Sequence, residues 1–506
     1  MVAGPPAEAP QTDAAAPTGG AAAPERAWRY VRDGVVRYWP LYPFAALGLL
    51  IRWLAVTVWF PTCPQPTFFG EVVNTEGCVQ TGWGDAFYFT TQGKLLADGH
   101  GFVNPTTWLL GATDPTIPQY LPGAGHPPMY SAFLGFLYRI GIDEPAAQRY
   151  VFPFIGALGV VLIGMAAWKI AGRRGKVVGM IAAGIAATYP MLWINDFRYL
   201  SESIYIPMIA VLVMCLYRFW RAPSFGNAAL VGAVLGVAGL TRGEGFFILA
   251  CTVPPLLWGM RDRTWAWRIK SALVTGGVMA AVLAPWILYN VTRFDPPMLI
   301  TSGTGVVLLH GSCDEAFYGP RIGYYAFECA EALPTREVDP YIHFEEEQDL
   351  VSREISRAYI MDNLSQVPIV ALARVGRMWD LYPPAPLEGV ELNDTLEQRG
   401  YWPSLTGLLY YWALLPFAVY GAVVLRRRKV PISPLLGIAL AVTITAASQL
   451  RGHPLPRPGR GAAGHVRGRG HRRRHRPPPP AWRFGGRRTH VQRGRRRGAD
   501  PRGALR

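Results

Sequence analysis

The run Leu41-Tyr-Pro-Phe-Ala-Ala-Leu-Gly-Leu-Leu-Ile-Arg-Trp-Leu-Ala-Val-Thr-Val-Trp-Phe60 opens a series of apolar segments that decides the fold of this chain. Its length matches the roughly 20 apolar residues that a helix needs to cross the hydrocarbon core of a bilayer. Further apolar runs follow at 127–141, 150–171, 177–195, 203–220, 228–241, 245–259, 271–290, 405–425 and 431–450. This pattern predicts an all-α, polytopic integral membrane protein with two long polar loops, 61–126 and 291–404.

The basic residues predict which side of the membrane each loop occupies, because cytoplasmic loops carry an excess of Lys and Arg. Four arginines between residues 26 and 37 precede the first run, which we interpret as a signal anchor and not as a cleavable signal peptide. Further basic clusters lie within 169–176, 218–221, 261–270 and 426–429. If these clusters are cytoplasmic, both long loops are extracytoplasmic. The run 127–141 must then enter and leave on one side, or another element must be re-entrant.

Composition excludes an ordinary soluble protein, since 50% of the 506 residues are hydrophobic and only 17% are charged. The formal net charge of +16 belongs to the tail, because residues 451–506 contain 18 Arg and one Asp and leave a net charge of −1 for residues 1–450. We therefore expect no nucleic-acid partner. The tail is open to two interpretations, a disordered basic segment or a frameshifted reading of GC-rich coding DNA, and we favour the second.

Five segments are predicted along the chain. They are a disordered, basic cytoplasmic N-terminus (1–40), a membrane module that includes the first long loop (41–290), an extracytoplasmic loop region (291–404), two C-terminal spans (405–450) and the Arg/Pro/Gly-rich tail (451–506).

The six cysteines separate by position. Cys63 and Cys78 lie in the first long loop, Cys313 and Cys329 lie in the second, and the other two lie within apolar runs. Two close pairs in extracytoplasmic loops are typical of local disulfides in an oxidising compartment. The alternative is four unpaired thiols.

The first polar loop contains Gly82-Trp-Gly-Asp85-Ala-Phe-Tyr88, which places a carboxylate and aromatic side chains near the predicted membrane surface. A sugar transferase at a membrane surface needs a base for the acceptor hydroxyl and cationic or polar groups for a phosphate leaving group. We predict Asp85 as the base, or as a metal-assisting carboxylate, and Tyr88 as a substrate-binding residue. The alternative is that Asp85 is a helix N-cap.

Charged residues follow the apolar run that ends at 195. In the segment 196–202, Arg198 and Glu202 are four residues apart, so one interpretation is an i,i+4 ion pair on a helix. The other is a site in which Arg198 contacts a lipid phosphate and Glu202 positions a sugar.

Arg242 and Glu244 separate the runs 228–241 and 245–259, which predicts a helical hairpin with these two residues at its tip. Charged groups at membrane depth are costly and usually line a functional cavity. We predict that both bind substrate and that Arg242 contacts phosphate. The alternative is a solvated hairpin tip.

His126 precedes Pro127 and Pro128, a pattern that starts a helix. We predict a helix start here and include His126 among the candidate substrate-binding residues. The acidic run 345–347 is interpreted as a solvated helical face.

Taken in order, these segments resemble the GT-C glycosyltransferases, specifically bacterial members similar to the dolichyl-phosphate-mannose protein mannosyltransferases and lipid A aminoarabinose transferases. The resemblance covers about residues 41–450. It rests on Gly84-Asp85 with Tyr88, the turn 95–102, His126-Pro-Pro-Met-Tyr130, the loop 172–174, Tyr189-Pro190, Leu200-Ser-Glu202, Leu240-Thr-Arg-Gly-Glu244, Ala284-Pro-Trp286 and Asn290.

Two features depart from the family pattern. Asp85 is followed by Ala86, where some relatives have a second carboxylate. The tail lacks the basic-aromatic segment with which the family usually continues, although reading one base later through 453–460 permits it.

The resemblance implies a GT-C-like helical core in the cell membrane with an active site on the extracytoplasmic face. It implies a polyprenyl-phosphate-linked donor, transfer of one hexose or pentose to a lipid, glycan or protein acceptor, and Asp85 as catalytic residue. It implies no certain cofactor, because some relatives bind a divalent metal ion and others do not. The loop 291–404 is expected to cap the cavity. One alternative is a lipid or oligosaccharide transporter, but such proteins often contain internal repeats and we see none in this sequence. The other alternative is a non-catalytic membrane protein.

Overall fold

The computed structural model describes residue 32 and residues 35–61, 84–335, 344–379, 381–382 and 400–448. In these ranges the chain consists of helices joined by loops, so the predicted all-α fold is confirmed. The predictions for Cys63 and Cys78, for most of the N-terminal segment and for the tail 451–506 lie outside the described residues.

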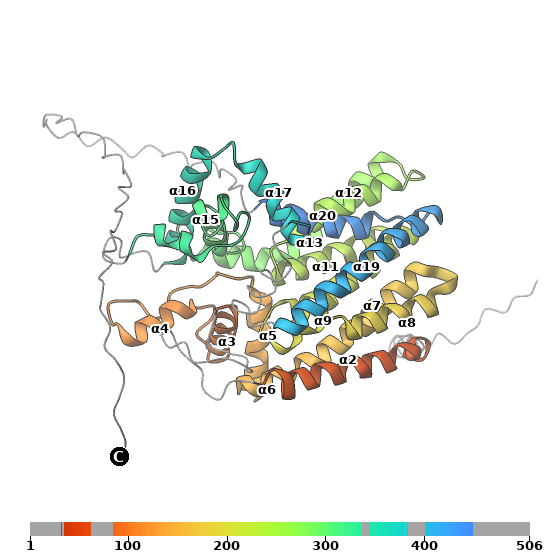
Figure 1. Cartoon of the computed structure of the whole chain (residues 1–506), viewed down its shortest axis with the longest axis horizontal. Coiled ribbons are helices and arrows are strands. Elements are labelled where there is room, and N and C mark those ends of the chain that lie inside the picture. Colours follow the sequence, from red (N-terminus) through yellow and green to blue (C-terminus); the bar gives the residue numbers. More distant parts are fainter. Residues whose placement is uncertain are drawn as a thin grey trace, which may run out of the picture. The chain divides into compact units, whose positions relative to one another are not determined.

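Helical segments that are long and apolar enough to cross a membrane dominate the described chain (Figure 1). These segments are Val35–Trp59, Pro145–Thr188, Glu202–Arg221, Trp265–Val291 and Tyr401–Arg427. Shorter apolar helices accompany them, namely α11 (Phe225–Thr241), α12 (Gly245–Gly259) and α20 (Ser433–Ser448). All of them coincide with apolar runs of the sequence, and the prediction of a polytopic membrane protein is confirmed.

Breaks divide the long segments into individual helices. Gly172 adopts a φ of 63°, a left-handed conformation that glycine adopts without a Cβ clash, and it reverses the chain. The helices on either side of this turn pack closely, because Gly179 lies against the carbonyl of Gly164. The elements of the long segments are η1 (Trp39–Leu41), α2 (Tyr42–Leu54), η2 (Ala55–Trp59), α6 (Pro145–Arg149), α7 (Phe152–Ala171), η3 (Gly172–Arg174), α8 (Gly175–Thr188), α10 (Glu202–Arg221), α13 (Trp265–Val291) and α19 (Tyr401–Arg427).

The loops between the long segments carry short helices of their own. The first long loop contributes α3 (Gly84–Ala97), α4 (Pro105–Thr113) and α5 (Pro128–Arg139). The break after α8 forms α9 (Pro190–Trp193) and η4 (Ile194–Phe197). The second long loop forms α14 (Gly303–Leu309), α15 (Asp314–Phe317), η5 (Phe327–Ala332), α16 (Glu345–Asp362) and α17 (Val367–Met378).

Helix α5 resolves the topology problem of the run 127–141, which would have had to enter and leave the membrane on the same side. It has 12 residues, which extend only about 18 Å against a hydrocarbon core of about 30 Å. It packs along α3, where Gly93 lies against Leu134 and the backbone of Gly135. A helix of this length beside α3 is not a span, so the spans on either side of it alternate in direction.

Basic helix ends gather at one end of the described helices. Arg221 near the end of α10 donates to the carbonyl of Lys169 near the end of α7. The Tyr217 hydroxyl donates to the carbonyl of Pro431, just before α20, at 2.7 Å. Because cytoplasmic loops are enriched in Lys and Arg, this is the end that the sequence assigns to the cytoplasm.

The second long loop builds a small apolar core of its own. This core includes Ala316, Phe317 and Val370, and the Cys313–Cys329 disulfide lies at its edge. The loop also packs on the first long loop, since the Ser302 amide donates to the carbonyl of Ala124 at 2.9 Å.

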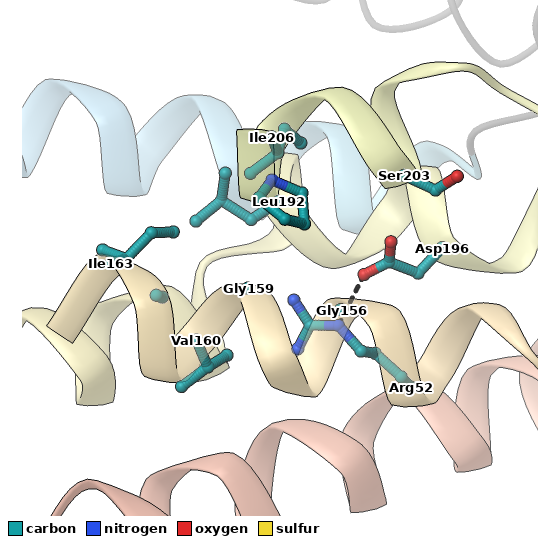
Figure 2. A pocket seen from close by; sticks show the side chains of 11 residues that line it. Arg52, Gly156, Gly159, Val160, Ile163, Leu192, Asp196, Ser203 and Ile206 are labelled. Atoms are coloured by element: carbon teal, nitrogen blue, oxygen red, sulfur yellow. Dashed lines mark hydrogen bonds and ion pairs between the residues drawn. The ribbon is translucent and has the colours of Figure 1, made fainter. Parts of the chain in front are cut away.

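A buried ion pair joins α2 to the break after α8 (Figure 2). Arg52 Nε lies 2.5 Å from Asp196 Oδ2, and both side chains are 3% exposed. The Arg52 Nη1 group also donates to the carbonyl of Gly48 at 3.1 Å. Removing one partner from such a pair leaves a buried charge uncompensated, which is strongly destabilising. The pair therefore fixes η4 against α2.

This ion pair was not predicted from the sequence. Its signal was present, because Arg52 is a charged residue inside the otherwise apolar run 41–60, and such residues usually have a buried partner.

Space beside the pair is provided by Gly156 of α7. A Cβ built on Gly156 overlaps both Asp196 Oδ2 and Arg52 Nε, so the helix approaches the pair only because this residue has no side chain (Figure 2).

We predict that Gly156→Ala separates Arg52 from Asp196 and destabilises the protein by on the order of 3 kcal/mol. The measurement is the thermal unfolding midpoint of the purified protein in detergent. Gly277→Ala in α13 is the matched control, because nothing lies within 4 Å of a Cβ at that position. Equal midpoints for the two variants would show that the ion pair tolerates the added methyl group.

Candidate active site

Asp85 lies in the first turn of α3. Gly84 begins the helix with a φ of 56°, and Asp85 follows it, one position inside the helix start. The N-cap interpretation of Asp85 is therefore wrong, although a carboxylate in the first turn is favoured by the helix dipole. The side chain is nevertheless 57% exposed, which leaves the carboxylate accessible to another molecule.

His126 is the described side chain that pairs with Asp85. Its Nε2 lies 3.5 Å from Asp85 Oδ1, and the imidazole is 32% exposed. The ring packs against Tyr88 and Phe89, with centroid distances of 4.7 Å in both cases. Burial lowers the pKa of His126, and the negative charge of Asp85 opposes this effect. The predicted helix start is also present, since Pro127 is the N-cap of α5.

Arg242, Glu202 and Glu244 form a cluster of charges at the start of α10 and the connection between α11 and α12. Arg242 Nη1 lies 2.6 Å from Glu202 Oε1, and its Nη2 lies 3.1 Å from Glu244 Oε1. The Nη1 group also approaches the Ser201 hydroxyl at 3.4 Å. The three charged side chains remain partly exposed, between 18% and 33%. The cluster carries one positive and two negative charges. Arg242 is therefore paired within the protein, neither surrounded only by solvent nor left as an unpaired cation.

The proposed helical pair between Arg198 and Glu202 is wrong. Arg198 follows η4 in an extended conformation, with φ −119° and ψ 160°, and α10 begins only at Glu202. The two residues therefore do not share a helix, and i,i+4 geometry does not arise. Glu202 pairs with Arg242 instead.

These groups act on one another electrostatically. The charges of Asp85, Arg242 and Glu202 all influence the pKa of His126. The packing places them in one region, because Ile204 of α10 packs with Phe89 and Tyr130, and Leu240 of α11 packs against Ala124. More than 150 positions separate the first of these charged residues from the last.

Tyr88 faces inward from this region and joins the two long loops. Its hydroxyl accepts from the Gly125 amide at 2.8 Å and approaches Glu345 Oε1 at 3.5 Å. Glu345 Oε2 in turn accepts from the Ala124 amide and from the Ser302 hydroxyl, both at 2.6 Å. Tyr88 therefore supports the His126 segment with its hydroxyl and contacts His126 with its ring.

The interpretation of the acidic run 345–347 as a solvated face is wrong for its first residue. Glu345 is buried, with 8% of its surface exposed, and burial raises its pKa to about 7. Nothing in the local sequence distinguishes it from Glu346 and Glu347. Its burial results from the packing of one long loop on the other, which no short sequence pattern encodes.

Metal-ligand side chains are sparse in the described part of the chain. No group of three or more His, Cys, Asp or Glu side chains there is arranged to hold a metal ion. Asp85 and His126 are two potential ligands, and the described residues supply no third beside them.

Part of this chain matches a known protein family. Residues 125–289 match the family model described as dolichyl-phosphate-mannose-protein mannosyltransferase. No curated protein and no solved structure matches the chain significantly. The matched segment begins next to His126 and includes Arg198, Glu202, Arg242 and Glu244. The resemblance to the GT-C-type membrane glycosyltransferases is therefore confirmed over residues 125–289, where the chain is similar to this family.

Proposed function

We propose that this chain transfers a sugar from a polyprenyl-phosphate donor to an acceptor hydroxyl at the site around Asp85 and His126. The observation that carries the proposal is the packing into one region of an exposed carboxylate, an imidazole and an arginine–carboxylate cluster from distant parts of the chain. These groups can supply the base and the phosphate-binding cation that transfer from a phosphate donor requires. The donor class is supported by the matched family, whose description names dolichyl-phosphate-mannose.

The proposed step is a substitution at the anomeric carbon of the sugar. The acceptor oxygen forms a bond to that carbon, the bond to the phosphate oxygen breaks, and the polyprenyl phosphate leaves with the electron pair. Asp85 takes the proton from the acceptor hydroxyl. Neutral His126, with its proton on Nε2, orients the carboxylate from 3.5 Å.

Arg242 is the group that we assign to the donor phosphate. Its guanidinium is held between Glu202 and Glu244, so an incoming phosphate must displace one carboxylate. The Glu244 contacts, at 3.1 to 3.3 Å, are longer than the 2.6 Å contact with Glu202. We assign the displacement to Glu244, which leaves Glu202 in place to accept hydrogen bonds from sugar hydroxyls.

The outward side of the membrane is the proposed location of this site. The basic ends of α7 and α10 lie at the opposite ends of those helices from the site, and they correspond to the cytoplasmic side under the positive-inside rule. The acceptor would then be extracytoplasmic, and the second long loop would cap the site through Ser302 and Glu345.

We predict that Asp85→Asn lowers kcat for sugar transfer by about 100-fold or more, because the amide accepts no proton. The assay follows the release of polyprenyl phosphate from a panel of polyprenyl-phosphate sugars, with the mannose derivative tested first. Asp98→Asn, which removes an exposed carboxylate just after the same helix, is the matched control. Full activity of Asp85→Asn would exclude Asp85 as the base. A wild-type protein inactive on the entire panel would contradict the donor assignment.

We predict that Arg242→Gln raises the donor KM by about tenfold or more, since a charge-assisted contact with phosphate is lost. Glu244→Gln should leave the donor KM within about threefold of the wild-type value or lower it, because it frees the guanidinium. Initial-rate kinetics on both variants decide the matter. If the two substitutions raise KM equally, the cluster has a structural role and Arg242 does not hold the phosphate.

We predict that Glu345 makes the wild-type protein lose stability as pH rises from about 5 to 7. Its pKa is raised to about 7 in the folded chain, so the folded state retains a proton that the unfolded state releases near its ordinary value of 4.5. A carboxyl with a raised pKa stabilises the folded state at low pH. This stabilisation, on the order of 3 kcal/mol, is lost as the pH rises through this window.

The measurement for this prediction is the unfolding midpoint of Glu345→Gln and Glu347→Gln across that pH range. The first variant should show a shallower downward slope than the wild type, because it carries no titrating carboxyl at this position. The second, on the same helix turn, should retain it. An unchanged slope in Glu345→Gln would assign the titration to another group.

A further inference from the structure

A second pocket opens at the basic end of the described helices, where α10, α12, α19 and α20 meet. Its volume is about 330 Å³, within the range of roughly 300 to 1,000 Å³ that is typical of small-molecule sites. Trp220 of α10 and Leu256 of α12 line one part of it. Arg426, Lys429 and Ser433, from the end of α19 and the start of α20, line the other.

The lining combines free positive charge with apolar and aromatic surface. Arg426 and Lys429 are both exposed, and within the described residues neither side chain forms an ion pair or a hydrogen bond. The opposite wall consists of Leu256, Pro255 and the Trp220 ring. A soluble anion would use only the cations of this pocket, whereas an amphiphilic anion would use both parts.

The left-handed backbone conformation of Lys429 is a further sign that its side chain has a role at the pocket. The Lys429 amide donates to the carbonyl of Arg426 and the Val430 amide to that of Leu425, both at 3.0 Å, which is the hydrogen-bond pattern of a Schellman motif. The central position of this motif is usually glycine, because it requires a left-handed conformation. Lys429 occupies it with a φ of 57°. The chain thus accepts an unfavourable conformation and keeps a cation at the rim of the pocket.

We propose that this pocket binds the headgroup phosphate of an anionic phospholipid. Arg426 and Lys429 contact the phosphate, Trp220 lies at the level of the lipid carbonyls, and the apolar wall contacts the start of an acyl chain. Basic clusters next to the ends of spanning helices attract anionic lipids, and tryptophan is enriched at this depth. The site is separate from the proposed sugar-transfer site and does not depend on it.

The test compares the double variant Arg426→Gln/Lys429→Gln with a control that removes equal charge at the same end. Arg173→Gln/Arg174→Gln is that control, because both arginines are exposed in η3 and neither lines the pocket. The charge-conserving variant Arg426→Lys/Lys429→Arg reports on the site if the loss of charge impairs folding. The full-length proteins are purified in neutral detergent and titrated with dioctanoyl phosphatidylglycerol, dioctanoyl phosphatidylcholine or inorganic phosphate.

The readout is the thermal unfolding midpoint. Phosphatidylglycerol should raise it by about 2 °C or more in the wild type, the η3 control and the charge-conserving variant, and not in the double Gln variant. An equal rise in the double Gln variant overturns the site. An equal rise with phosphatidylcholine overturns the role of the anionic headgroup. An equal rise with inorganic phosphate at the same concentration shows a free-anion site and overturns the assignment to a lipid.

Discussion

The ion pair between Arg52 and Asp196 is the constraint on which the arrangement of the candidate site depends. Neither charge can be buried alone, so the two must meet, and their meeting fixes η4 against α2. The chain leaves η4 only a few residues before Glu202, the first residue of α10. The position of Glu202, and through it that of Arg242, therefore follows from a contact formed inside the helical bundle.

A second constraint connects the two long loops. Glu345 from α16 accepts hydrogen bonds from Ala124 and Ser302, and it approaches Tyr88. The segment 124–126 is thereby held from both loops, and His126 is its last residue. Because a buried carboxyl without these partners would be costly, the second loop packs over the first in one arrangement. This coupling explains why an acidic residue far from Asp85 in sequence bears on the geometry around it.

The sequence predicted the parts of this structure that depend on local pattern. Apolar runs located the long helices, and the tip at Arg242 and Glu244 was located because charge is costly beside apolar segments. The sequence could not predict which distant residues come into contact in the fold. The sequence offered Arg198 as the partner of Glu202 because four residues separate them, whereas the chain is extended at Arg198 and Glu202 meets Arg242. The burial of Glu345 likewise depends on loop packing, which has no periodic signature.

The charge of the candidate site bears on the direction of the proposed reaction. A polyprenyl-phosphate sugar is a phosphodiester with one negative charge, whereas the released phosphate monoester carries between one and two. Glu202 and Glu244 both lie against Arg242, so their negative charges oppose the additional charge of the product more than that of the donor. In the proposed reaction, Glu244 would return to the guanidinium as the product leaves and would restore the contact of 3.1 Å. Under the proposed function, the two carboxylates that compete with the donor phosphate for Arg242 would also favour release of the product.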